Sequence, residues 1–127
     1  MKRCCSILQA TRNIEILRRI VVYCDEAEET CRQLGDSLEA LRGSSTFRNA
    51  ASMCVLQIGE LSTHLTEEFR TTHPAMPWKS IRGMRNVAVH HYGSFDTERL
   101  WNTLKQDIPS LRDCCAHWIA ELSKNPA

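Results

Sequence analysis

The chain has 127 residues and a formal net charge of +1, with 43% hydrophobic and 24% charged residues. This composition is typical of a single soluble domain, which we expect to span residues 1–127. No run of about 18 apolar residues could cross a membrane, and no apolar stretch near Met1 resembles a signal peptide. We therefore expect a cytoplasmic protein without a membrane partner.

Apolar residues first recur at helical spacing between Thr11 and Leu34. Steps of three and four residues place most of them on one stripe, which predicts a first helix over this range. Gly35 is expected to end it, because glycine is a common helix stop. Asp36 can then cap a short second helix that runs through Leu41.

The stretch "RGSS" interrupts this pattern, and Ser45 or Thr46 can cap the helix that follows. Apolar residues predict a long third helix from about Phe47 to Thr71, which ends before the two prolines of "THPAMP". A fourth helix is expected from Trp78, just after a proline that favours a helix start, to about His90.

The stretch "YGSFD" predicts a turn in which Gly93 ends the fourth helix and Ser94 or Asp96 caps the next. Apolar residues from Leu100 to Leu122 predict a last helix, which Pro109 should bend because proline removes a backbone donor. No alternating strand pattern competes with these helices. The sequence therefore predicts an all-α fold, a four- to five-helix antiparallel bundle.

The cysteines do not form a recognisable metal or disulfide pattern. Two adjacent pairs and three isolated residues give no Cys-x-x-Cys or Cys/His zinc spacing: Cys4, Cys5, Cys24, Cys31, Cys54, Cys114 and Cys115. We expect them to be reduced and mostly buried as small apolar side chains. A redox or metal-binding role is the less favoured alternative.

The most unusual stretch is "RNVAVHHY", residues 85–92. It brings a permanent cation, an amide, two imidazoles and a phenol to one helix end, as Arg85, Asn86, His90, His91 and Tyr92. Arg85 and His90 are about 140° apart around an ideal helix. They share a surface only if the last helical turn loosens or a second subunit supplies the complement.

These side chains suit RNA cleavage without a metal ion. His90 can move a proton from the 2′-hydroxyl that distinguishes RNA from DNA, because imidazole titrates near neutral pH. Arg85 stays charged and forks onto phosphate oxygens, and Asn86 can hold a phosphate oxygen or the arginine itself. Such a site needs no cofactor and no metal, and the sequence contains no ligand cluster for one.

Residues upstream can support this site. Glu60 is a carboxylate on an otherwise apolar helix, so it either reaches water or pairs with a cation such as Arg85 and orients it. Gly59 beside it would let another helix come close.

The sequence between Phe69 and Phe95 is locally basic, because it contains no Asp or Glu but does contain Arg70, Lys79, Arg82 and Arg85. A phosphate backbone would be attracted to this region. A solvated helix face is an equally good interpretation of Lys79 and Arg82.

The stretches "LQIGEL", "PWKSIRGMRNVAVHHYGSFDTERLW" and "DIPSL" together resemble the HepT-like branch of the HEPN ribonuclease toxins, whose motif is Arg-Asn-x-x-x-His-x-Tyr. The resemblance extends from about Met53 to Trp118, roughly half the chain. It implies a homodimeric, metal-independent endoribonuclease that is the toxin of a toxin-antitoxin pair. It also implies a partner, an MntA-like minimal nucleotidyltransferase that acts as the antitoxin.

On the matching positions, the resemblance assigns Arg85, Asn86 and His90 to catalysis. It makes Tyr92 the tyrosine that the antitoxin adenylylates. His91 occupies a variable position of the motif, so it is a candidate supporting residue like Glu60, and its role stays open.

Two other functions remain compatible with the sequence. The chain could be a non-catalytic subunit that binds nucleotide or substrate for a separate nucleotidyltransferase, or a structural dimer. The sequence does not indicate which RNA would be cut.

Overall fold

The computed structural model describes residues 2–89 and 97–124, and the side chains of 7–86 and 97–124 within them. The described residues form helices and no strand. In chain order the helices are α1 (Lys2–Leu34), α2 (Leu38–Gly43), α3 (Ser45–Ser62), α4 (Glu67–Thr72), α5 (Trp78–Val89), α6 (Thr97–Asn102), the π-helical turn η1 (Thr103–Asp107) and α7 (Ile108–Lys124). The expected turn at Gly93 and the caps at Ser94 or Asp96 lie outside the described residues.

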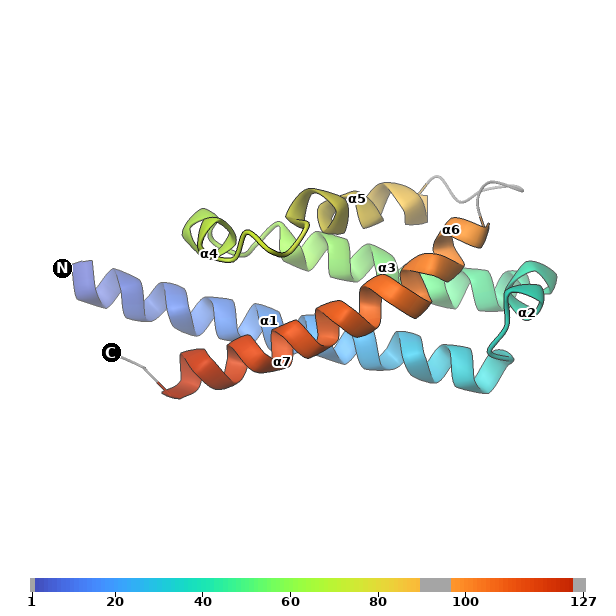
Figure 1. Ribbon diagram of the computed structural model, residues 1–127, viewed down its shortest axis with the longest axis horizontal. Helices are drawn as coiled ribbons and strands as arrows, with labels where there is room; N and C mark the ends of the chain where they lie inside the picture. The colour runs from blue at the N-terminus through green and yellow to red at the C-terminus, as the bar shows by residue number, and fades with distance from the viewer. Residues whose placement is uncertain (1, 90–96, 125–127) are drawn as a thin grey trace.

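The long helices run up and down in alternation, as Figure 1 shows. Helix α3 packs against α1 and also against α5, while α7 runs along α1. The short helices α2 and α4 lie at opposite ends of the bundle (Figure 1). The prediction of an all-α antiparallel bundle is confirmed.

One core joins these helices. Its fully buried side chains come from α1, α2, α3, α6 and α7, and the largest are Phe47, Leu17, Ile20, Leu41, Ile58, Leu100, Ile108 and Leu111. Burying one such side chain stabilises the fold by about 1.5–3 kcal/mol relative to leaving it in water. Helix α5 adds Trp78, Ile81 and Met84, so its inner face is fixed against the bundle.

Helix α1 begins earlier than predicted, at Lys2 instead of Thr11. Its first turns bury little, because Ile7 and Leu8 are 45% and 70% exposed. The predicted start at Thr11 is therefore too late, because it was inferred from apolar residues that are buried. The predicted end is confirmed, since Gly35 follows the last helical residue with a positive φ of 98°.

Serines cap the next two helices instead of the predicted residues. Ser37, not Asp36, caps α2 by accepting a hydrogen bond from the Ala40 amide at 3.0 Å. Asp36 instead accepts a hydrogen bond from Lys105 Nζ at 2.7 Å. Ser44 in turn caps α3 in place of Ser45 or Thr46. The capping chemistry was predicted correctly, but each assigned position was too late or too early by one or two residues.

The prediction of one continuous third helix from Phe47 to Thr71 is wrong, because α3 ends at Ser62 and a separate helix, α4, starts at Glu67. Thr66 caps α4, and buried Asn13 of α1 holds this cap from both sides. Asn13 Nδ2 donates to Thr66 Oγ1 at 3.1 Å, and the Thr66 amide donates to Asn13 Oδ1 at 3.2 Å. The partner that fixes the break is therefore 53 positions away in the sequence.

The last helix departs from regular α geometry just before Pro109. The five residues Thr103–Asp107 form a π-helical turn, and the Ile108 amide donates to the Thr103 carbonyl. Proline cannot donate a backbone hydrogen bond and crowds the carbonyl four residues before it, so the widened turn accommodates it.

Four cysteines are buried as predicted, namely Cys24, Cys31, Cys54 and Cys115. Burial raises the pKa of the Cys24 thiol to about 12 and that of Cys54 to about 11. Because the thiolate is the reactive form, these side chains act as apolar packing groups near neutral pH. The side chains of Cys4 and Cys5 lie outside the described residues.

Gly59 allows the closest approach between α3 and α5. A Cβ atom at this position would lie 2.9 Å from the Arg85 backbone nitrogen and 3.2 Å from the Ile81 carbonyl oxygen. Both contacts are with the backbone of α5, which cannot move aside as a flexible side chain can. The expectation that another helix comes close here is met, and the helix is the one that carries Arg85.

We expect Gly59→Ala to lower the free energy of unfolding by about 1–2 kcal/mol. Overpacking against α5 outweighs the helix-forming advantage of alanine. Urea unfolding followed by circular dichroism would measure the change. Gly43→Ala is the matched control, because a Cβ there meets no described atom within 4 Å, and its stability should equal or exceed that of wild type, since alanine favours the helix. Equal stability of Gly59→Ala and Gly43→Ala would contradict the close-contact account.

Candidate functional site

Arg85 and Asn86 lie near the C-terminal end of α5, on its exposed surface. Asn86 lies across the helix from the core residues Ile81 and Met84. Arg85 is four residues after Ile81 and lies at the edge of the surface that packs on α3. Asn86 is thus directed outward, whereas the Arg85 side chain is directed along α3 toward Glu60. His90, His91 and Tyr92 follow the end of α5 and lie outside the described residues.

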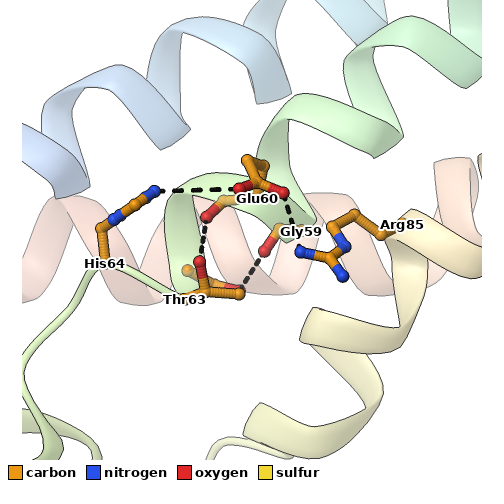
Figure 2. Close-up of polar contacts among 6 residues, drawn as sticks. Gly59, Glu60, Thr63, His64 and Arg85 are labelled. Carbon is orange, nitrogen blue, oxygen red and sulfur yellow. Dashed lines mark hydrogen bonds and ion pairs between the residues drawn. The ribbon is translucent and has the colours of Figure 1, made fainter.

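Arg85 contacts Glu60 of α3, and Figure 2 shows the two side chains pointing toward each other. Arg85 Nη1 donates to Glu60 Oε2 at 2.9 Å. Glu60 thus pairs with the cation, and its exposed side chain reaches water as well. The side chains are 45% and 47% exposed, so the pair contributes about 0–1 kcal/mol to stability. Its main effect is to orient the guanidinium group.

The second oxygen of Glu60 faces a histidine that the sequence pattern does not single out. His64 Nε2 lies 3.8 Å from Glu60 Oε1, so the carboxylate stands between His64 and Arg85 (Figure 2). The four-residue spacing of Glu60 and His64 was the available signal, because such residues are neighbours on a helix.

The last turn of α3 is closed by its own hydroxyl groups, which keeps this region ordered. Ser62 Oγ donates to the Gly59 carbonyl at 2.7 Å, and Thr63 Oγ1 donates to the Glu60 carbonyl at 2.7 Å. The Glu60 carbonyl also accepts from the Thr63 amide at 3.2 Å, so the hydroxyl groups add to the backbone bonds that close this helix end. The Glu60 side chain therefore projects from a fixed backbone toward α5.

Arginine leaves donors available beyond the contact with Glu60. A guanidinium group carries five N–H donors in a planar fork that matches a phosphate. Among the guanidinium nitrogens of Arg85, only Nη1 has a hydrogen-bond partner in the described part of the chain. The remaining edge can bind an anion while Glu60 holds the side chain in place.

The basic region predicted from sequence divides into two parts. Arg70 serves the fold, because its Nη1 donates to the Leu65 carbonyl at 2.6 Å. Lys79 and Arg82 are exposed on α5, and neither forms an ion pair with a described residue. We call Lys79, Arg82 and Arg85 the basic face of α5.

A separate hollow lies near the other end of α5 and contains none of the predicted site residues. Its volume is about 400 Å³, and it is lined by His73, Trp118, Glu121, Leu122 and Lys124. The His73 ring stacks on Phe69 with centroids 4.1 Å apart and donates from Nδ1 to the Phe69 carbonyl at 2.7 Å. This histidine is thus held mainly by packing.

Neither a metal centre nor a membrane span is found in the described ranges. Across residues 2–89 and 97–124, no three His, Cys, Asp or Glu side chains come together as metal ligands. Among the helices of these ranges, none has the length and apolar character needed to cross a bilayer.

Comparison with curated proteins finds similar sequences in archaea and bacteria. A Thermococcus cleftensis protein provisionally named ribonuclease HepT is 42% identical over 55 residues, which are 43% of this chain and 50% of the relative. A Methanocaldococcus jannaschii protein with a provisional RNase name is 38% identical over 55 residues, with the same coverage. A Caldanaerobacter subterraneus protein, also provisionally named an RNase, is 41% identical over 54 residues, or 42% of this chain and 48% of the relative. The matched segment spans about half the length of these relatives.

No solved structure matches the chain. The sequence model of the family described as Ribonuclease HepT-like matches residues 10–118, which is most of the chain. The match includes all of α3 and α5 and therefore the Glu60–Arg85 contact. The chain belongs to the HepT-like ribonuclease family.

Proposed function

We propose that this chain is a metal-independent endoribonuclease and the toxin of a toxin-antitoxin pair. The observation that carries the proposal is an exposed arginine, held by Glu60 2.9 Å away, at the start of the motif Arg-Asn-x-x-x-His-x-Tyr. Family membership and the basic face of α5 support it. An oriented, solvent-facing cation beside an uncharged amide suits a phosphate substrate.

In the proposed reaction, His90 takes the proton from a ribose 2′-hydroxyl. The 2′-oxygen then bonds to the adjacent phosphorus, and the bond from phosphorus to the 5′-oxygen breaks. The leaving 5′-oxygen takes up a proton, and the products are a 2′,3′-cyclic phosphate and a 5′-hydroxyl. Arg85 stabilises the charge on the non-bridging oxygens, and Asn86 holds one of them.

Glu60 acts through Arg85 and is a positioning residue in this proposal. A free arginine side chain samples many rotamers, and ordering it costs up to about 2 kcal/mol of entropy. The contact with Glu60 restricts these rotamers before RNA binds. The Arg85 guanidinium group stays accessible to an anion because the side chain is about half exposed.

The active form is expected to be a homodimer with a two-fold axis near the α5 helices. Arg85 and His90 are about 140° apart around an ideal helix, so one copy does not easily aim both at the same phosphate. Two copies related by a two-fold axis would line one cleft with both sets. An active monomer in solution scattering would exclude this arrangement.

We expect His90→Ala to abolish RNA cleavage while leaving the helical fold unchanged. Wild-type cleavage should continue in excess chelator and leave cyclic phosphate ends, because the 2′-hydroxyl and not a metal-bound water attacks. End analysis of cleaved RNA would measure this. His91→Ala is the matched control, since it removes the neighbouring imidazole, and it should retain most of the activity.

Chelator-sensitive cleavage, or full activity of His90→Ala, would contradict the mechanism. A purified protein that cleaves no RNA but binds nucleotide would instead favour the non-catalytic subunit of a nucleotidyltransferase.

Control of the toxin is proposed to occur at Tyr92, by an MntA-like nucleotidyltransferase. The Tyr92 hydroxyl oxygen attacks the α-phosphorus of ATP, pyrophosphate leaves, and the phenolic proton passes to solvent. The new phosphodiester adds a negative charge and a nucleoside close to the motif. It can therefore compete with RNA phosphate for Arg85 by both charge and volume.

We expect Tyr92→Phe to stay toxic in the presence of the partner, because the phenol has no assigned role in proton transfer. Growth assays with and without the partner would measure the escape. Mass spectrometry after co-expression should find an adenylyl adduct on the wild-type peptide that contains "VAVHHYGSF". Complete neutralisation with unmodified Tyr92 would rule out this control and point to steric blocking.

A further inference from the structure

Gly83 lies in the middle of α5, where glycine is unfavourable. Compared with alanine, glycine in a helix interior loses more conformational freedom on folding. At position 59, close packing explains the glycine, because a Cβ there would lie 2.9 Å from the backbone of α5. A Cβ at Gly83 would meet no described atom within 4 Å. Packing within the described chain therefore does not account for this glycine.

The described neighbours of Gly83 on the outer surface of α5 are polar or basic. Gly83 is on the side of α5 opposite Ile81, whose side chain is in the core. Its helical neighbours Lys79 and Asn86, at four residues before and three after, are exposed. Arg82 borders the same surface and is also exposed.

We propose that Gly83 is a contact point for the RNA backbone, where the missing side chain lets a ribose-phosphate unit touch the helix. This inference rests on the proposed function and adds a substrate-positioning element to it. Lys79 and Arg82 supply positive charge beside the contact. Lys79 and Asn86 are about 10 Å apart along the helix axis, so the element leads from the first turn of α5 to Asn86 in the motif.

Charge complementarity favours RNA over a second copy of the chain at this surface. The sequence between Phe69 and Phe95 contains no acidic residue, so a polyanion meets no repulsion there. In a symmetric dimer packed directly on Gly83, Lys79 and Arg82 of one copy would face the same cations of the other.

The test is binding of a short 2′-O-methyl RNA of mixed sequence, which keeps the backbone charge but lacks the attacking hydroxyl. Gly83→Ala should weaken binding roughly three- to tenfold, the effect of one lost backbone contact. The same substitution should raise the midpoint of thermal unfolding by about 2–5 °C, because alanine favours the helix. Gly83→Gln should weaken binding further.

Matched variants test whether a change in RNA binding comes from the Gly83 contact or from a general effect of substitution. Gly43→Ala changes a glycine with equally open surroundings on α2 and should leave RNA affinity unchanged. Lys79→Gln and Arg82→Gln should each reduce the salt dependence of binding by about one counterion. Arg18→Gln removes the same charge from the exposed surface of α1 and should leave the salt dependence near wild type.

The outcomes distinguish this inference from the proposed function. A wild-type protein that does not bind RNA would overturn the proposed function, and this inference with it. If wild type binds RNA and Gly83→Ala binds equally well, only the Gly83 contact is overturned. Sedimentation of the same samples measures their oligomeric state. If wild type is a dimer and Gly83→Ala is a monomer, this surface binds a second copy of the chain and not RNA.

Discussion

The approach of α5 to α3 at Gly59 is the contact on which the candidate site depends. Because Gly59 has no side chain, the α5 backbone at Arg85 can lie directly against α3. The next residue, Glu60, then faces the Arg85 side chain and accepts its hydrogen bond at 2.9 Å. A local pair of residues thus sets the distance between two helices and the direction of a cation. Moving α5 outward would change both together.

Helix α5 combines a buried face with a charged one, and the two faces have different roles. Trp78, Ile81 and Met84 anchor the helix in the bundle, so its position does not rely on the half-exposed ion pair. The pair can therefore serve orientation while contributing little to stability. A cation held in this way loses less freedom when it binds an anion, which is how a rigid scaffold supports a catalytic side chain.

Features with local signals were predictable from the sequence. Helical periodicity indicated the bundle, and a carboxylate on an apolar helix indicated the contact with Arg85. The break after Ser62 was not predictable, because Asn13 fixes it from 53 positions away and the apolar pattern continues through it. His64 ranked below the motif histidines because its one signal, the four-residue spacing from Glu60, is common on helix surfaces. The placement of His90 relative to Arg85 stays a prediction.

The central claim is that Glu60 contributes to RNA cleavage only through Arg85. A double-mutant cycle with Glu60→Gln and Arg85→Gln, read as kcat/KM for RNA cleavage, tests it most directly. We expect Glu60→Gln alone to lower kcat/KM about tenfold, and to have no further effect once Arg85 is glutamine. If the two substitutions lower kcat/KM independently, so that their effects multiply in the double variant, Glu60 does not act through Arg85 and the account is contradicted.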